Sequence, residues 1–281
     1  MATAFLLATS GIKQYLPGKS SRCIPTTQAI WARLARVPTR EILNRNSHQL
    51  AREFRNYVML IDDFIDAEKL TPRDALFHPA VFSARGVYDA IARTHSEATA
   101  RELSRVFAEG RQKLIEGVSN AKPESYSETV KHRDATTGEY AALYARLMNC
   151  AHGVKKPGLE ERFRRFALAA QYVDDFSDAY QDLAQGAPNL FTSLLKENPR
   201  EMQAFRSARR KLTQRELKRA APKTFARYLE DYRKLANLTT AGEGKLLKPF
   251  LAGASLLTFT FGVPLKQTRE IYGKLKSEAK K

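Results

Sequence analysis

The fold expected for this chain depends on one stretch, Gln171-Tyr172-Val173-Asp174-Asp175-Phe176-Ser177-Asp178, which continues to Asp182. The apolar residues in and before it recur at intervals of three and four, which predicts an α-helix. Asp174, Asp178 and Asp182 step by four residues and therefore share one stripe of that helix, with Gln171 on the same side. Carboxylates that repel one another along a stripe destabilise a helix unless a cation or a basic ligand compensates. The stretch therefore predicts a helix whose charge another group must offset.

A second acidic cluster, Asp62-Asp63-Phe64-Ile65-Asp66, lies earlier in the chain. Asp62 and Asp66 are one helical turn apart and share a stripe. One D-D-x-x-D on an exposed helix is usually a solvated face, but both clusters lie in apolar sequence, where an uncompensated carboxylate is costly. Carboxylate oxygens suit Mg²⁺, which shares its coordination shell with waters and substrate phosphates. The two clusters together predict a site for magnesium and diphosphate facing one cavity.

The rest of the chain predicts an all-α fold, because apolar residues recur at three and four almost throughout and strand-like alternation is scarce. We expect a single domain over residues 1–281, with a core at about 26–262 and a basic C-terminal helix at 264–281. Proline and glycine place the breaks between helices. The predicted helices are 26–37, 40–68, 80–94, 97–119, 124–149, 159–184, 188–196, 199–219, 222–237, 243–260 and 264–279.

The composition narrows the class of protein. Of the 281 residues, 43% are hydrophobic, which is enough for a sizeable core. Cys23 and Cys150 are isolated and share no metal-like spacing, which predicts a reducing compartment and no disulfide framework. No apolar run is long enough for a membrane span. The histidines do not cluster, so we expect no zinc site. We expect a soluble, cytoplasmic protein, as a monomer or homodimer.

The net charge of +17 has three interpretations: nucleic-acid binding, adsorption to an anionic membrane surface, and plain solubility. No zinc-finger spacing or aromatic RNA-binding signature is present, so nucleic acid is not favoured. Peripheral contact with an anionic membrane stays open. Many basic residues fall on the helix predicted at 199–219, namely Arg206, Arg209, Arg210, Lys211, Arg215, Lys218 and Arg219.

The motifs resemble those of the class I isoprenoid synthases, which comprise prenyl diphosphate synthases, squalene/phytoene synthases and class I terpene cyclases. Ile61 to Asp66 looks like their first aspartate-rich motif. The second region is similar to that of squalene/phytoene synthases, whose Gln, acidic and Gly offsets fall here on Gln171, Asp174, Asp178, Asp182 and Gly186. The tail Gly186 to Phe191 is similar to that of squalene/phytoene synthases and bacterial large-terpene cyclases. The resemblance spans residues 50 to 195.

The resemblance implies a helical bundle around a central cavity that takes a prenyl diphosphate and two or three Mg²⁺ ions, with Mn²⁺ as an alternative. It implies metal binding by Asp62, Asp63, Asp66, Asp174, Asp178 and Asp182, and catalytic roles for Asp62, Asp66 and Asp178. By helix geometry, Asp63 and Asp175 sit about 100° round their helices and should support the ligands from behind.

Basic residues should complete a diphosphate site, because magnesium alone rarely balances the charge. The predicted substrate-binding residues are Arg55, Lys131, Arg133, Gln171 and Tyr140, and Lys245 and Lys248 are weaker candidates. The small residues Thr136-Thr137-Gly138 permit a kink in the helix at 124–149. An apolar wall should exclude water from a carbocation. Its candidates are Phe54, Tyr57, Tyr140, Tyr144, Phe176 and Phe259, although aromatic residues at helical spacing are more often plain core.

We therefore expect an enzyme that ionises an allylic prenyl diphosphate to give a terpene or a head-to-head prenyl product. Chain elongation is a less favoured alternative, because Pro17-Gly18-Lys19 replaces the Gly-Gly-Lys region of elongating synthases. Two alternatives come from other classes, namely an all-α nucleotide pyrophosphatase and a non-catalytic basic helical scaffold. The sequence leaves open the chain length of the substrate and the product.

Overall fold

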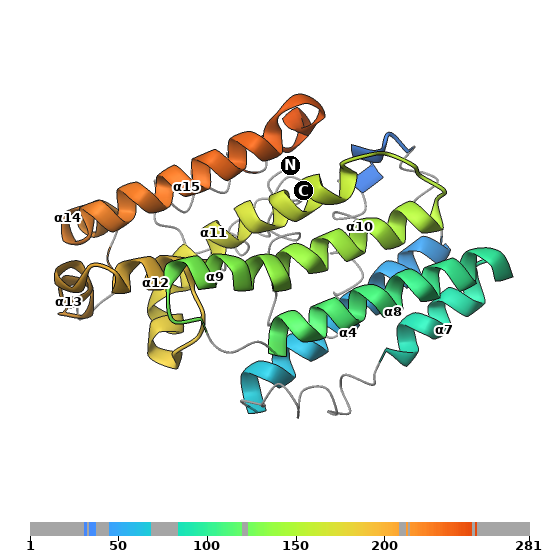
Figure 1. Cartoon of the computed structure of the whole chain (residues 1–281), viewed down its shortest axis with the longest axis horizontal. Coiled ribbons are helices and arrows are strands. Elements are labelled where there is room, and N and C mark those ends of the chain that lie inside the picture. The colour runs from blue at the N-terminus through green and yellow to red at the C-terminus, as the bar shows by residue number, and fades with distance from the viewer. Residues whose placement is uncertain are drawn as a thin grey trace, which may run out of the picture. The chain divides into compact units, whose positions relative to one another are not determined.

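The computed structural model describes residues 31–32, 34–37, 45–68, 84–119, 123–207, 212, 214–248 and 251. This part of the chain is all-α, as predicted, and contains no β-strand (Figure 1). Its elements are α4 (Arg45–Glu68), α7 (Arg85–Thr94), α8 (Glu97–Ser119), α9 (Tyr126–Arg133), the π-helical segment η2 (Asp134–Gly138), α10 (Glu139–Ala151), α11 (Leu159–Gln185), α12 (Leu190–Lys196), α13 (Pro199–Ser207), α14 (Gln214–Ala220), α15 (Pro222–Thr240) and the 3-10 helix η3 (Gly242–Leu247).

The chain divides into two compact units, each described here by itself. The α4 unit comprises Ser10–Ala121 and Asp134–Arg164 and contains α4, α7, α8, η2 and α10. The α15 unit comprises Met1–Thr9, Lys122–Arg133 and Arg165–Lys281, and contains α9, most of α11 and α12 to α15. The single domain over 1–281 stays a prediction.

Aromatic side chains at helical spacing hold the α4 unit together. Phe54 and Tyr57 of α4 are buried, with Phe107 of α8 between them at ring distances of 6.2 and 5.3 Å. Trp31 is fully buried, and its indole Nε1 donates to Asn149 Oδ1 at 3.0 Å. A buried indole N–H needs such a partner, so this bond fixes the residues near Trp31 against α10.

The π-helical segment η2 interrupts the helix predicted at 124–149, at the place where Thr136-Thr137-Gly138 predicts a kink. Arg164 of α11 spans this segment, because its Nη1 donates to Asp134 Oδ1 at 3.0 Å and its Nη2 pairs with Glu139. Gly117 of α8 lies against it: a Cβ there would come within 2.5 Å of the Ala135 carbonyl oxygen. Glycine therefore allows α8 to approach the backbone of η2.

The core of the α15 unit forms around Phe191 of α12. Its ring lies 5.1 Å from Phe176 of α11, 5.2 Å from Tyr228 of α15 and 6.2 Å from Phe205 of α13. Phe191, Tyr228 and Phe205 are almost completely buried. A short helix of seven residues is thus held by tertiary packing rather than by its own propensity.

Two predicted helices are wrong in detail. The helix predicted at 199–219 is two helices, α13 and α14, and Leu212 between them is not helical. The Leu212 N–H donates to the Tyr180 hydroxyl at 3.1 Å instead of to a helical carbonyl. The basic residues expected on one helix are therefore divided, with Arg206 on α13 and Arg215 on α14. The helix predicted at 243–260 begins with the 3-10 helix η3.

Most boundaries agree with the proline and glycine signals. Pro199 and Pro222 are the first residues of α13 and α15, as expected for a residue without a backbone N–H. Gly153, Gly158 and Gly186 adopt positive φ in the two predicted loops on either side of α11. The predicted helix 264–279 and Cys23 lie outside the described residues. No helix in the described ranges is long and apolar enough to cross a membrane.

Substitution of Gly117 tests the close approach of α8 to η2. Gly→Ala inside a helix usually stabilises by about 1 kcal/mol. Gly117→Ala should instead destabilise by about 1 to 3 kcal/mol, because the new methyl group would meet the Ala135 carbonyl at 2.5 Å. Gly86→Ala is the control, since its Cβ would meet only the carboxylate of Glu53, at 3.1 Å. Urea denaturation measures both, and a stabilised Gly117→Ala would contradict the close contact.

Candidate functional site

A buried ion pair joins α9 to α11 in the α15 unit. Arg133 donates to both carboxylate oxygens of Asp175, from Nη2 at 2.8 Å and from Nε at 3.2 Å. The Asp175 side chain is 2% exposed and that of Arg133 is 18% exposed. The carboxylate also accepts from Gln171 Nε2 at 2.6 Å and from the backbone N–H of Leu190 at 2.7 Å. Its oxygens are thus satisfied on several sides, which a buried carboxylate requires.

Asn189 extends this network to the far end of the acidic stripe. Its side chain is fully buried, and its Nδ2 donates to the Asp175 carbonyl oxygen at 2.6 Å and to Asp182 Oδ2 at 2.7 Å. Its Oδ1 accepts from the N–H of Thr192 at 2.9 Å and so caps α12. Arg133 Nη2 also donates to the Pro188 carbonyl at 2.6 Å. The loop before α12 is therefore held against α11.

The surroundings of Asp182 oppose its ionisation. Burial is the largest cause and raises the pKa of Asp182 to about 6. The negative charges of Asp175 and Asp178 also contribute to this rise, while the hydrogen bond from Asn189 and the charge of Arg133 oppose it, and the pKa of about 6 is the net result. Asp182 is therefore partly protonated in mildly acidic solution.

The structure places the predicted second cluster on α11 in three different environments. Asp174 and Asp182 are half-buried, Asp175 is buried and Asp178 is exposed. The predicted first cluster, Asp62, Asp63 and Asp66, falls within α4 of the other unit, and its side chains lie outside the described residues. No group of three acidic, histidine or cysteine side chains among the described residues is arranged to hold a metal ion. The common cavity stays a prediction.

The predicted substrate-binding residues divide between the two units. Arg133 and Gln171 both bind Asp175, and Lys131 is exposed on α9. In the α4 unit, burial raises the pKa of Tyr140, and the nearby positive charge of Arg55 opposes this. Arg55 and Tyr140 therefore lie close together, whereas Lys245 and Lys248, in and just after η3, are exposed.

The predicted wall residues are part of the aromatic cores. In the α4 unit, Phe54 stacks on Tyr140 at 5.5 Å and lies 6.3 Å from Tyr144. Burial raises the pKa of Tyr57 to about 12, although Arg111 Nε donates to its hydroxyl at 3.1 Å. The buried Tyr144 hydroxyl has no hydrogen-bond partner among the described residues. Phe176 belongs to the core of the α15 unit, and Phe259 lies outside the described residues.

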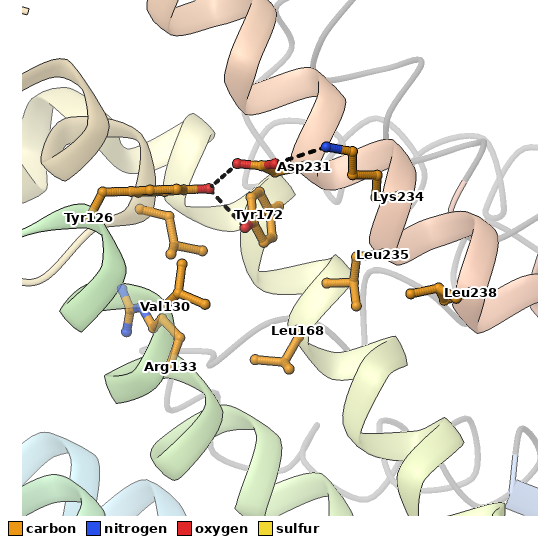
Figure 2. A pocket seen from close by; sticks show the side chains of 10 residues that line it. Tyr126, Val130, Arg133, Leu168, Tyr172, Asp231, Lys234, Leu235 and Leu238 are labelled. Carbon is orange, nitrogen blue, oxygen red and sulfur yellow. Dashed lines mark hydrogen bonds and ion pairs between the residues drawn. The ribbon is translucent and has the colours of Figure 1, made fainter. Parts of the chain in front are cut away.

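An open pocket of about 390 Å³ lies between α9, α11 and α15 (Figure 2). One end carries a hydrogen-bonded chain, in which the Tyr172 hydroxyl lies 3.0 Å from that of Tyr126, which donates to Asp231 Oδ2 at 2.9 Å. Lys234 Nζ lies 4.0 Å from Asp231 Oδ1. Five of the other lining residues are apolar, namely Val130, Leu168, Leu190, Leu235 and Leu238, and the sixth is Arg133.

Reasoning from the sequence missed three features of this region: the Arg133–Asp175 pair, the role of Asn189 and the Tyr126–Tyr172–Asp231 chain. The sequence contained part of the evidence for these features. Asp175 and Asp182 are seven residues apart, two helical turns, so they share a face of α11. An Asn between a proline and an apolar run is also a typical helix N-cap. The Tyr126–Asp231 contact has no local signal.

No family model matches the chain, and neither the curated proteins nor the solved structures contain a significant match. The resemblance to class I isoprenoid synthases therefore rests on the two aspartate motifs and the tail that follows the second one, and membership of that superfamily stays a proposal.

Removal of the Asp175 carboxylate should destabilise the protein strongly. Asp175→Ala should cost about 3 to 5 kcal/mol, because it leaves the largely buried Arg133 without its counter-charge. Glu102→Ala is the control, since Glu102 forms an exposed ion pair with Arg105 of α8 at 2.6 Å and should change stability little. The comparison is made by chemical denaturation. An equal, small shift in both variants would contradict a structural role for the buried pair.

The pKa of Asp182 predicts how stability depends on pH in protein freed of metal by a chelator. The pKa of Asp182 is about 6 in the folded protein, and its ordinary value is 3.8. Protonated Asp182 therefore contributes its full stabilisation of the fold below about pH 4, and this contribution is lost as the pH rises through about 6. Asp182→Asn keeps an acceptor for Asn189 but cannot ionise. It should be more stable than the natural chain by about 1 to 2 kcal/mol at pH 7.5, allowing for solvent screening, with no difference at pH 3.5. A difference independent of pH would contradict the raised pKa.

Proposed function

We propose that this chain is a magnesium-dependent enzyme that ionises an allylic prenyl diphosphate and releases pyrophosphate, forming a terpene or a head-to-head prenyl product. The observation that carries the proposal is the pair of aspartate clusters, each of which falls within one long helix, α4 or α11. Such stripes of like charge are destabilising by themselves. A site for a divalent cation and a diphosphate would account for both aspartate clusters.

The chemistry of the acidic residues fits Mg²⁺. Mg²⁺ usually takes one or two carboxylates and completes its shell with waters and substrate phosphates, so a closed cage of protein ligands is not required. On α11, Asp178 is exposed and Asp174 is half-buried, while Asp182 uses one carboxylate oxygen to accept from Asn189. The residues that would hold the ions are Asp62, Asp66, Asp174, Asp178 and Asp182. Bound magnesium would neutralise negative charge that develops on the departing diphosphate.

The other residues would orient the site and keep it dry. Arg133 and Asn189 bind Asp175 and Asp182, and so fix the rotation of α11 on which the direction of the acidic stripe depends. Arg55, beside Tyr140, would supply positive charge to the diphosphate. The buried Tyr144 hydroxyl, without a partner in the described part of the chain, would suit a cavity that holds a ligand or water.

A non-catalytic helical scaffold is the second candidate, and one observation favours it. The acidic stripe of α11 already has a cation beside it, because Arg133 binds Asp175 and its positive charge also acts on Asp182 and Asp174. Arg133 carries one positive charge, whereas the stripe has four aspartates, so it does not balance the whole stripe. The scaffold therefore accounts for the buried Asp175 through its pair with Arg133.

Product analysis tests the proposal. Purified protein is incubated with Mg²⁺ and geranyl, farnesyl or geranylgeranyl diphosphate, with and without isopentenyl diphosphate, and pyrophosphate release is measured. We expect magnesium-dependent release from a prenyl diphosphate alone. Longer diphosphates formed only with isopentenyl diphosphate would indicate an elongating synthase, and turnover of nucleotides alone would indicate a pyrophosphatase. Turnover of neither substrate class would support the scaffold.

Asp178→Asn should lower turnover of the prenyl diphosphate by at least a hundredfold, because it removes the charge of a proposed metal ligand at an exposed position of α11. Asp89→Asn is the control, since Asp89 of α7 is a half-exposed aspartate with only long ion pairs, at 3.9 Å to Arg85 and 3.7 Å to Arg93. Thermal unfolding verifies that both variants are folded. Equal activity in the two variants would contradict the assignment of Asp178.

A further inference from the structure

Basic side chains gather at one end of the α15 unit, on α12, α13, α14 and the first turns of α15. This group, called here the basic end, is exposed throughout. Its described members are Lys196, Arg200, Arg206, Arg215, Lys218, Arg219, Lys223 and Arg227. Figure 1 shows α13, α14 and the start of α15 close together within this unit.

Specific contacts hold these elements together. The Glu201 carboxylate of α13 accepts from the backbone N–H groups of Lys223 and Thr224, both at 3.0 Å, and so caps α15. Arg227 Nη1 lies 2.9 Å from Glu197 Oε2, and Lys218 Nζ lies 5.4 Å from the centre of the Phe225 ring. The basic end is therefore a surface of defined geometry, formed by helices that contact one another.

The sequence concentrates positive charge there. The stretch from Lys196 to Arg227 contains eleven Lys or Arg and three Glu, so it supplies a large part of the net charge of +17. Of the three Glu, Glu197 pairs with Arg227, and Glu201 accepts hydrogen bonds from the backbone at the N-terminus of α15. Among the described residues, the other seven cations form no ion pair with an acidic side chain. Their mutual repulsion costs stability, which an anionic partner would relieve.

The basic side chains of α14 lie on the side of the helix that faces away from the core. Leu217 is buried, at 4% exposure. Arg215, Lys218 and Arg219 lie within about 100° of one another on the opposite side of the helix, because each residue advances about 100°. All three are exposed. The helix therefore has one apolar residue facing inward and a compact cationic face outward.

We propose that the basic end binds the surface of an anionic lipid bilayer. Clusters of four to eight Lys or Arg on short helices suit anionic headgroups, to which each contributes about 1 kcal/mol. Single-stranded nucleic acids require exposed aromatic side chains on which bases stack, and the described residues expose none. This contact goes beyond the proposed function and does not depend on it, since it uses none of the aspartate motifs.

Vesicle sedimentation tests the proposal with the full chain. The natural chain should bind vesicles of phosphatidylcholine and phosphatidylserine but not vesicles of phosphatidylcholine alone, and 0.5 M salt should release it. The test variant combines Arg215→Gln, Lys218→Gln, Arg219→Gln and Lys223→Gln, and should weaken binding at least tenfold. The matched control, which loses the same charge from α7 and α8, combines Arg85→Gln, Arg93→Gln, Arg101→Gln and Arg105→Gln, and should bind as the natural chain does.

Thermal unfolding of both variants shows whether each is folded, and the prenyl diphosphate assay is run on both as an independent readout. Equal loss of vesicle binding in the two variants would overturn the proposal, because it would assign the effect to net charge. Equal binding to neutral vesicles would overturn it as well. Tighter binding of a nucleic-acid duplex than of anionic vesicles, lost selectively in the test variant, would assign the basic end to nucleic acid instead.

Discussion

The buried ion pair between Arg133 and Asp175 is the constraint on which the α15 unit depends. It joins the last residue of α9 to the middle of α11, and through the N–H of Leu190 it also fixes the start of α12. Breaking such a pair costs about 3 to 5 kcal/mol, and a folded domain is stable by only about 5 to 15 kcal/mol. The positions of three helices therefore depend on one carboxylate.

This pair also explains how an acidic helix can exist beside an apolar core. Asp174, Asp175, Asp178 and Asp182 would repel one another along α11, but they lie in different environments. Asp175 is neutralised by Arg133, Asp182 is held by Asn189 with a raised pKa, and Asp178 remains in water. The stability requirement is thereby met at the buried positions, whereas the Asp178 carboxylate lies at an exposed one.

Most of the helices were predictable because their signals are local. Apolar spacing and the prolines at 199 and 222 place α13 and α15, and glycines with positive φ mark the loops around α11. The irregularity at Thr136 to Gly138 was predictable for the same reason, since the π-helical segment η2 lies there. The break at Leu212 was not, because its N–H is satisfied by Tyr180, which lies far away in the sequence. The Arg133–Asp175 pair is likewise a long-range contact, so the sequence identified both residues as candidates but not as partners.

Neighbouring aspartates of the acidic motif lie in different environments, and this affects how substitutions in the motif should be interpreted. In a D-D-x-x-D motif, the second residue and the last are three positions apart, about 300° round the helix, and thus about 60° from sharing a face. Here the second, Asp175, points to α9 and α12, and the last, Asp178, points to solvent. Under the proposed function, one helix would use different residues of the same motif for folding and for ligand binding. A substitution at Asp175 would therefore report chiefly on stability, whereas one at Asp178 would test the proposed metal site. If every aspartate of the motif were treated alike, the folding defect expected at Asp175 could be misread as a loss of the proposed activity.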